Sequence, residues 1–239
     1  MYNQQEKICL VIPCYNEAKR LDFKKLSNSG DNCFFLFVND CSVDGTLDLL
    51  KKNLNRNMFI LNLEKNLGKG EAVRRGMLHM KNIPIWNEID WVGFWDADLA
   101  TPLDELNNFI LFKNTFYPNV EAIFGSRVVR LGSSILRSYK RSISGRLFAT
   151  FIGFTLGIVC YDSQCGAKLF RKDVVDKYFK EPFVSKWIFD VEILLRMGQK
   201  NIAEYPLREW TDVPGGSLKV SKIALAVLKD VLKLRKRYF

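Results

Sequence analysis

Two aspartates, Asp96 and Asp98, are separated by one residue and directly follow an apolar run at 91–95. Carboxylate oxygens are hard ligands of the kind that Mg²⁺ and Mn²⁺ prefer. An ion held there could also bind a diphosphate and neutralise the charge that grows on a departing nucleoside diphosphate. We therefore predict that Asp96 and Asp98 hold a metal ion and that Asp98 takes part in catalysis. The alternative interpretation is a turn at a strand end that leads into a helix cap.

The segment 39–46, Asn-Asp-Cys-Ser-Val-Asp-Gly-Thr, is dense in side chains that accept hydrogen bonds. Asp40 could accept from the edge of a nucleotide base, whereas 44–46 has the composition of a turn followed by a helix cap. Lys69 lies between two glycines and could approach a phosphate, although the spacing is not that of a P-loop. By themselves these segments do not identify a ligand, and the order of the motifs along the chain is more informative than any one of them.

Histidine and cysteine usage narrows the chemistry further. The chain has a single histidine, His79, which excludes sites built from several histidines. Its six cysteines contain no C-x-x-C pair, and no secretion signal precedes the apolar segment that starts at Ile8. We expect reduced, mostly buried thiols in a cytosolic protein. With 239 residues, 48% of them apolar, and no linker or repeat, residues 1–239 are expected to form one domain.

The net charge of +10 comes from two stretches. Residues 122–161 include six basic and no acidic residues, and residues 217–239 include seven basic residues and one acidic residue. Both stretches are also apolar: 147–161 has no charge, and apolar residues recur at helical spacing from Val220 to Val231. This pattern is typical of helices that lie on an anionic lipid surface.

We therefore expect membrane-facing amphipathic segments at about 135–160 and 218–239, with an anionic membrane surface as a partner and no nucleic acid. The uncharged run at 147–161 is too short to cross a bilayer, which takes roughly 20 residues. A helix that packs on the core and exposes a basic face is the alternative interpretation. The pattern predicts no particular oligomeric state.

Short β-rich runs alternate with helical stretches along the chain, which predicts an α/β fold with a mostly parallel central sheet flanked by helices. Strands are expected at 8–12, 33–38, 58–62, 91–95 and 122–124, the first ended by Pro13. Helices are expected after Asn16, from Thr46, near Gly70 and from Pro102. In such sheets ligands bind at the carboxyl ends of the strands, where the polar motifs lie.

The order of the motifs resembles the family 2 glycosyltransferases of the GT-A fold, and among them the polyprenyl-phosphate sugar transferases. The likeness covers nearly the whole chain. The segments 162–170 and 187–192 are most similar to dolichyl-phosphate β-glucosyltransferases, and Ala100 stands where relatives that use GDP-mannose carry a Gln. That favours UDP-glucose. The motifs that carry the first half of the resemblance are Val-Ile-Pro-Cys-Tyr-Asn-Glu at 11–17, the segment 39–46, Asn-Leu-Gly-Lys-Gly at 66–70, Asp-Ala-Asp at 96–98 and Gly-Ser-Arg at 125–127.

The resemblance implies three groups of site residues. Asp96 and Asp98 fall on the family's site for the metal ion and the diphosphate, and Asp190 is expected either to bind sugar hydroxyls or to act as a base. Asn39 replaces the first Asp of a usual pair, which leaves the base contact to Asp40. The nucleotide-sugar positions are Pro13, Tyr15, Glu17, Val38, Asp40, Lys69, Asp96, Gln164 and Trp187. The positions for the acceptor phosphate are Arg127, Arg137 and Arg141, with Lys140 as a further contact.

The expected activity is an inverting, Mg²⁺- or Mn²⁺-dependent transfer of glucose from UDP-glucose, a UDP-sugar donor, to a polyprenyl phosphate such as dolichyl or undecaprenyl phosphate. Eukaryotic relatives carry an N-terminal membrane helix that is missing here, so we expect a peripheral protein on the cytoplasmic face of the membrane. A phosphate acceptor is already an anion and needs no general base. One alternative is GDP-mannose as the donor. A second is a sugar-hydroxyl acceptor on a polysaccharide, with Asp190 as base, and a third is a non-catalytic membrane or nucleic-acid binding protein.

Overall fold

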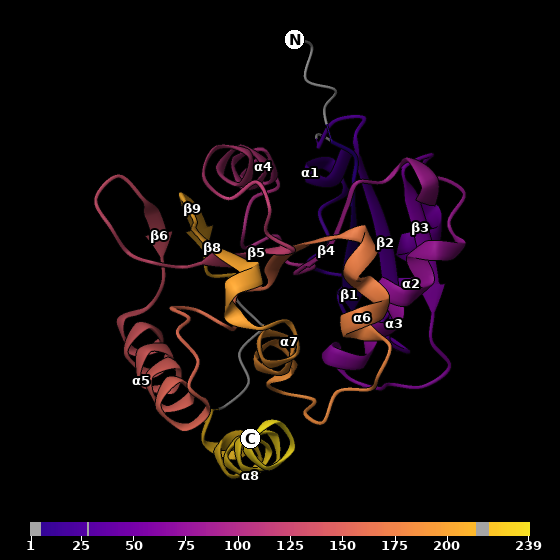
Figure 1. Cartoon of the computed structure of the whole chain (residues 1–239). Helices are drawn as coiled ribbons and strands as arrows, with labels where there is room; N and C mark the ends of the chain where they lie inside the picture. Colours follow the sequence, from indigo (N-terminus) through magenta and orange to yellow (C-terminus); the bar gives the residue numbers. More distant parts are fainter. Residues whose placement is uncertain (1–5, 28, 214–219) are drawn as a thin grey trace. The chain divides into compact units, whose positions relative to one another are not determined.

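The computed structural model describes residues 6–27, 29–213 and 220–239, and within its helices it leaves out the side chains of 139–141 and 220–224. The chain forms two compact units (Figure 1). The first consists of Met1–Leu99 and Gly166–Pro182, and the second of Ala100–Cys165 and Phe183–Phe239. Each unit is described by itself.

The first unit is built on five strands in the order β3-β2-β1-β4-β7 (Figure 1). Strands β1 to β4 are mutually parallel, and β7 runs antiparallel to β4. All residues of β2 and β4 are buried, as expected of central strands covered on both faces. The strands are β1 (Ile8–Cys14), β2 (Cys33–Asn39), β3 (Met58–Asn62), β4 (Trp91–Trp95) and β7 (Ala167–Arg171).

Helix α3 (Lys69–His79) packs closely against this sheet. A Cβ atom on Gly76 would lie 2.7 Å from a methyl carbon of Val11 and 2.8 Å from one of Val38, so only glycine allows this approach. The packing of α3 on β1 and β2 also places the start of the helix near the ends of those strands. Lys69 is the first residue of α3 and therefore lies there. The other helices of the unit are α1 (Phe23–Ser27), α2 (Thr46–Lys52) and α6 (Val175–Phe179).

The second unit contains two pairs of parallel strands. Strand β5 (Ala122–Ser126) pairs with β8 (Ile202–Pro206), and β6 (Ser134–Leu136) pairs with β9 (Glu209–Thr211). Two long helices, α5 (Tyr139–Leu156) and α8 (Val220–Tyr238), contact each other (Figure 1). The remaining helices are α4 (Glu105–Phe116) and α7 (Phe189–Met197).

Most predicted elements are confirmed, including the mostly parallel sheet with flanking helices. Strands β3 and β4 have the predicted bounds, α2 starts at Thr46, and α3 starts one residue before Gly70. The six cysteines are free thiols and four of them are buried, as predicted. Burial raises the pKa of Cys33 to about 12, so this thiol stays protonated at neutral pH. No helix in the described part of the chain combines the length and the apolar content needed to span a bilayer.

The prediction that Pro13 ends the first strand was wrong. Strand β1 continues to Cys14, and Pro13 pairs with Val38 of β2. The pairing of β1 with β4 stops at Val11, so Pro13 lies where β1 has a single neighbouring strand. Proline, which cannot donate a ladder hydrogen bond, is tolerated at such an edge.

Two predicted helix starts were also wrong. Asn16 has a left-handed φ of 56° and its backbone N–H donates to Ser42, so the chain forms a loop and α1 begins only at Phe23. Helix α4 begins at Glu105 instead of Pro102. The residues before it form a tight turn in which the backbone N–H of Glu105 donates to the carbonyl of Pro102.

Candidate functional site

Asp96 and Asp98 follow the last residue of β4 in the first unit. The Asp96 backbone is held from both sides, because its N–H donates to the carbonyl of Gly166 and its carbonyl accepts from Leu99. A Cβ atom on Gly166 would lie 1.9 Å from Asp96 Oδ2, so only glycine leaves room for this carboxylate. Lys69 Nζ lies 2.5 Å from Asp96 Oδ1 and is its present counter-ion. The structure thus joins Lys69 and Asp96, which are predicted to bind the same ligand.

Glu17 adds a third carboxylate to the negative field of this region. Burial raises the pKa of Glu17 above its usual range, and the charges of Asp98 and Asp96 raise it further against the opposing effect of Arg20. Both oxygens of Glu17 are bound by the Arg20 guanidinium. Glu17 is therefore an acid whose ionised form is disfavoured mainly by burial, with smaller effects of Asp98 and Asp96.

The donor set fits a hard divalent cation. Asp96 and Asp98 supply carboxylate oxygens, and the carboxylate of Asp96 packs directly against Gly166. Within the described ranges, no group of three or more His, Cys, Asp or Glu residues is arranged to hold a metal. Two carboxylates are the partial ligand set that Mg²⁺ usually completes with substrate phosphates and water.

Asp40 lies at the end of β2 and is 2% exposed. Its two oxygens accept hydrogen bonds from the backbone N–H groups of Leu67 and Gly68, both at 2.8 Å. Asp40 therefore holds the loop that carries Lys69, a role that the sequence did not indicate. Its contact with a nucleotide base stays a prediction.

Three further predicted nucleotide residues, Pro13, Tyr15 and Val38, lie at or beside the carboxyl end of β1. Tyr15 is 47% exposed and presents an aromatic surface, whereas Val38 is fully buried in β2 and Pro13 is partly buried. The loop after β1 is joined to the loop after β2, because the backbone N–H of Glu17 donates to Thr46 and that of Ala18 donates to Asp44. These bonds fix the backbone next to Tyr15.

Arg127, at the end of β5 in the second unit, forms a bidentate ion pair with Asp162. Its Nε and Nη2 atoms lie 2.6 and 2.8 Å from the two carboxylate oxygens, and its backbone N–H donates to Asp162 Oδ2. The guanidinium also lies 5.3 Å from the ring centre of Trp210. Burial opposes the ionisation of Asp162, but the charge and hydrogen bonds of Arg127, with a smaller effect of Arg137, hold its pKa below the usual range.

Arg137 lies near the same carboxylate and against α5. A Cβ atom on Gly145 would be 2.8 Å from Arg137 Nη2, so the guanidinium rests on the bare helix backbone at this glycine. Two of the three predicted phosphate-binding arginines thus gather around Asp162. The side chains of Arg141 and Lys140 lie outside the described part of the chain.

Gln164, Trp187 and Asp190 are all in the second unit. Trp187 is 38% exposed, and Asp190 is buried in the first turn of α7. Gln164 Nε2 and Ser126 Oγ are buried, and neither has a hydrogen-bond partner among the described residues. Buried polar groups are usually paired, so such orphans at a candidate site indicate places where a ligand could bind.

Sequence reasoning did not assign a role to Asp162 or Glu204. Glu204 of β8 accepts the backbone N–H groups of Tyr161 and Asp162 at 2.8 and 2.7 Å, and thereby fixes the residue that pairs with Arg127. Asp162 opens the segment 162–170, which carries part of the family resemblance, and that was the available signal. Glu204 lies in an ordinary strand pattern, and nothing in the sequence indicated a role for it.

A model of the family described as "Glycosyl transferase family 2" matches residues 9–179. The dolichyl-phosphate beta-glucosyltransferase ALG5D of Trichomonas vaginalis is 32% identical, over 94% of this chain and 73% of the relative. The dolichyl-phosphate beta-glucosyltransferase of Homo sapiens is 30% identical, over 98% of this chain and 76% of the relative. These matches confirm the similarity that the motifs predicted.

Solved structures share the fold. Glucosyl-3-phosphoglycerate synthase from Mycobacterium tuberculosis, solved with Mn²⁺, UDP and glucosyl-3-phosphoglycerate, has a TM-score of 0.66 at 17% identity and covers 97% of this chain and 81% of its own. Mannosyl-3-phosphoglycerate synthase from Rubrobacter xylanophilus has a TM-score of 0.68 at 16% identity, over 97% of this chain and 74% of its own. The predicted GT-A fold is confirmed.

We expect Asp162→Asn to destabilise the protein strongly at neutral pH, because it leaves the Arg127 guanidinium buried without its carboxylate. The loss should be about 3 kcal/mol in urea unfolding at pH 7. Because the pKa of Asp162 is lowered in the folded state, wild type should keep its advantage above the ordinary Asp pKa of about 3.9 and lose it as the pH falls further.

The matched control is Asp173→Asn. Asp173 pairs with Arg171 at 2.7 Å, but both side chains are largely exposed, so we expect a change of less than about 1 kcal/mol. Equal losses for the two variants, or a gap between wild type and Asp162→Asn that stays constant down to pH 3, would contradict the buried ion pair.

Proposed function

Because the chain belongs to glycosyl transferase family 2, we propose that residues 1–239 act as one glycosyltransferase domain that moves glucose from UDP-glucose to a polyprenyl phosphate with inversion. The observation that carries the proposal is the similarity to dolichyl-phosphate beta-glucosyltransferases, which extends over 94 to 98% of the chain and so includes residues of both units. Ala100, in place of the Gln of GDP-mannose relatives, supports UDP-glucose as the donor.

The first unit binds the nucleotide sugar in this proposal. Tyr15 offers an exposed aromatic surface to the base, and Lys69, released from Asp96, offers its ammonium group to the diphosphate. The carboxylates of Asp96 and Asp98 would hold a Mg²⁺ or Mn²⁺ ion. When bound, such an ion supplies positive charge that stabilises the leaving diphosphate. A distant structural neighbour was solved with Mn²⁺ and UDP, which supports this choice of ligands.

The second unit binds the acceptor. Arg127 and Arg137 present guanidinium groups to the phosphate head, and Asp162 restrains Arg127 so that little side-chain freedom is lost on binding. Arg141 is proposed as a third contact. Gln164, with its unpaired buried amide, and Trp187 bind the sugar, and Asp190 binds sugar hydroxyls.

The reaction needs no proton acceptor on the protein. A phosphate oxygen of the acceptor is already anionic at neutral pH and attacks the anomeric carbon of glucose, while the bond from that carbon to the diphosphate oxygen breaks and UDP leaves. Attack from the side opposite the leaving group inverts the configuration. The protein's residues neutralise the charge of the two reactants and hold them in the geometry for attack. Holding them in this geometry makes the reaction effectively unimolecular and thereby lowers its barrier.

We further propose that the protein binds peripherally to the inner, cytoplasmic face of a membrane through α5 and α8. Exposed apolar side chains fall on one side of each helix, because their spacing is three, four or seven residues. We call these two rows the apolar stripes. They consist of Ile143, Leu147, Phe151 and Phe154 on α5, and of Leu225, Leu228 and Leu232 on α8 together with Phe239, which directly follows the helix.

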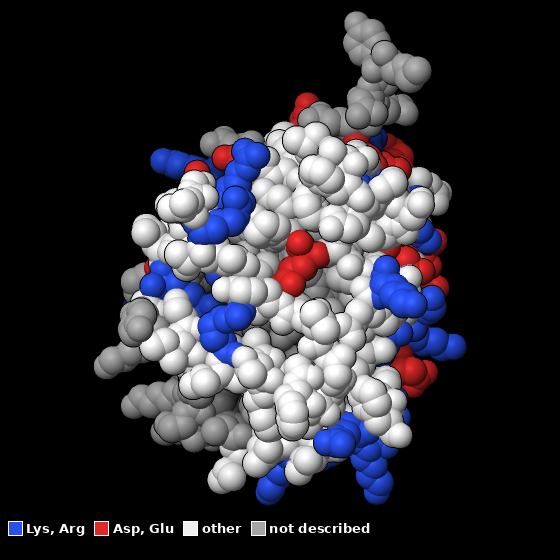
Figure 2. Space-filling view, turned by 60° about the vertical axis from the view of Figure 1, so that its left-hand side comes forward, with Lys and Arg blue, Asp and Glu red and all other residues white. Residues whose placement is uncertain are grey.

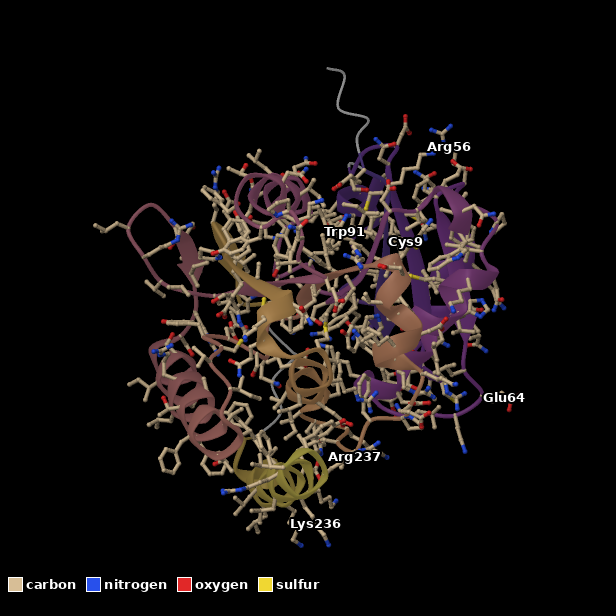
Figure 3. All side chains as sticks on the ribbon, viewed as in Figure 1. Cys9, Arg56, Glu64, Trp91, Lys236 and Arg237 are labelled. Carbon is tan, nitrogen blue, oxygen red and sulfur yellow. The ribbon has the colours of Figure 1, made fainter. Side chains whose placement is uncertain are left out.

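Positive charge accompanies the stripe on α8. Lys229, Arg235 and Lys236 are exposed and flank it, and Lys236 and Arg237 project from the last turns of the helix (Figure 3). The face shown in Figure 2 is largely uncharged, with an acidic group near its centre and separate groups of Lys and Arg around it. Apolar stripes bordered by basic residues match an anionic bilayer, in which the apolar groups enter the interface and the cations meet lipid phosphates.

The test of the reaction incubates the protein with radiolabelled UDP-glucose or GDP-mannose, each with and without polyprenyl phosphate and with Mn²⁺. We expect label in the lipid fraction from UDP-glucose only, and only with the lipid. Asp98→Asn should lower this transfer roughly hundredfold or more because the diphosphate loses a ligand of its ion. The exposed Asp48→Asn on α2 is the matched control and should keep full activity.

Each of the other outcomes would contradict a different part of the proposal. Transfer of label from GDP-mannose would show that the donor is GDP-mannose instead of UDP-glucose. Transfer to a sugar hydroxyl that depends strongly on Asp190 would show that the acceptor is a sugar instead of a polyprenyl phosphate. Full activity of Asp98→Asn would remove the metal role. Absence of binding to UDP with Mn²⁺ would point to a non-catalytic member of the family.

Arg137→Ala should raise the concentration of polyprenyl phosphate at half-maximal rate by about tenfold, because one charge-assisted contact to the phosphate is lost. The half-saturating concentration of UDP-glucose should stay within about twofold. Arg146→Ala removes the same charge from the exposed face of α5 and should have little effect on either value. Equal changes for both substrates would place Arg137 outside the acceptor site.

Sedimentation with vesicles of phosphatidylcholine and phosphatidylglycerol tests membrane binding. The double variant Leu225→Ser, Leu232→Ser should bind at least about tenfold more weakly, because each leucine loses its burial in the interface. Leu111→Ser, at a leucine that is 62% exposed on α4, is the control and should bind like wild type. Binding to neutral vesicles as strong as to anionic ones would contradict the role of the basic residues.

A further inference from the structure

Helix α8 has two faces with different surroundings. One face carries its apolar stripe, whereas Asp230, Val231 and Leu234 lie on the other face and are at most 9% exposed. Tyr238 extends this inner face to the last turn of the helix. The inner face therefore carries a carboxylate and a phenol hydroxyl that need partners inside the second unit.

The partner of Asp230 is Ser185, which is 1% exposed. The Ser185 hydroxyl donates to Asp230 Oδ2 at 2.7 Å, and its oxygen accepts the backbone N–H groups of Trp187 and Ile188 at 3.1 and 3.0 Å. A chain of hydrogen bonds thus runs from α8 to the backbone of the residue proposed to contact the sugar.

The partner of Tyr238 is Glu192 of α7, which is fully buried. Glu192 accepts from the Tyr238 hydroxyl at 3.1 Å, from Arg196 at 2.7 Å and from the backbone N–H of Val184 at 2.6 Å. A second chain of hydrogen bonds therefore joins α8 to the same irregular segment, 183–188, at its beginning. We call the two chains together the latch.

The segment that the latch holds has no helix or strand of its own. It carries Trp187 and leads directly into α7, where Asp190 lies in the first turn. Asp230 and Tyr238 are eight residues apart, which is about 12 Å along a helix. Two anchors at this distance fix both the position and the rotation of α8 against the segment.

We infer that Asp230 and Tyr238 are positioning residues that link the binding of α8 to an anionic bilayer with the placement of Trp187 and Asp190. The inference rests on the proposed function, because these two residues serve a sugar substrate only in a sugar transferase. A helix is stiff, so lipid that holds its outer face restricts the motion of its inner face. Membrane binding then orders the segment at the place where the lipid acceptor is found.

Hydrogen exchange measured by mass spectrometry tests the link without any reaction. In wild type, anionic vesicles should slow the exchange of peptides that cover 184–190 by about threefold or more, because the bonded N–H groups of Val184, Trp187 and Ile188 open less often. In Asp230→Ala the vesicles should still bind, within about twofold of wild type, but should no longer slow this exchange.

Three further variants make the result specific. Asp230→Asn keeps an oxygen that can accept the Ser185 hydroxyl and should restore most of the vesicle effect. Lys233→Gln removes the exposed partner of Asp230, 3.1 Å away, leaves Ser185 in place and should respond like wild type. Tyr238→Phe removes one hydroxyl group and should weaken the vesicle effect on exchange. This variant tests the link if Asp230→Ala does not fold.

Activity provides the second measurement. In Asp230→Ala the turnover of lipid acceptor in vesicles should fall about tenfold, while the half-saturating concentration of UDP-glucose changes less than about twofold. The inference is overturned if vesicles leave the exchange of 184–190 in wild type unchanged, or if Asp230→Ala responds as wild type does. It is also overturned if Asp230→Ala and Tyr238→Phe both lose vesicle binding, since the latch would then belong to the lipid-binding surface.

The two proposals fail separately. A vesicle effect on exchange that disappears in Asp230→Ala, in a protein that transfers no glucose, keeps the link and rejects the reaction. Transfer of glucose with no vesicle effect on exchange keeps the reaction and rejects the link.

Discussion

Buried carboxylates that accept hydrogen bonds from loop backbone are the interaction on which both units depend. A carboxylate out of water is strongly unfavourable unless its oxygens are bound, and a loop N–H out of water needs an acceptor. Asp40 solves both problems by accepting two backbone N–H groups, and Glu192 accepts one together with two side chains. The partly buried Glu204 also accepts two backbone N–H groups.

This arrangement separates acids whose oxygens are bound within the protein from acids whose oxygens stay accessible. Asp40 and Glu192 are nearly or fully buried and use their oxygens within the protein, whereas the Asp96 side chain is 36% exposed and is paired with a mobile type of partner, a lysine. A lysine ammonium can leave a carboxylate at modest loss when a stronger cation or an anionic ligand arrives, because exposed ion pairs contribute little stability. Exposure and the kind of partner, more than residue type, mark Asp96 as available for chemistry.

The second unit combines these buried hydrogen bonds with exposed apolar surface. The apolar stripes on α5 and α8 expose large side chains, among them Phe154 at 93% and Leu225 at 74%. Contiguous exposed apolar side chains of this kind are a feature of interaction surfaces, which is why membrane binding is proposed for the stripes. The buried face of α8 is hydrogen-bonded to Ser185 and to Glu192 of α7, and the proposed link between lipid binding and the site rests on these bonds.

The sequence by itself determined five strands of the mostly parallel sheet, the starts of α2 and α3 to within one residue, the family and the motifs at the strand ends. These features depend on local periodicity and on short runs of residues, so they can be read over a few neighbouring positions. Where the local rules failed, as at Pro13 and Asn16, the reason was an edge position and a hydrogen bond to Ser42, both supplied by distant strands or loops.

Only the tertiary structure decided which polar residues meet. Arg127 pairs with Asp162 across 35 residues, Tyr238 with Glu192 across 46, and Gly166 makes room for Asp96 although 70 positions separate them in the chain. The physical reason is that an acid forms the same bonds with any suitable donor, so its residue type does not select a partner. Chain topology brings one particular donor within 3 Å, and that choice is made only when the sheet and its helices have packed.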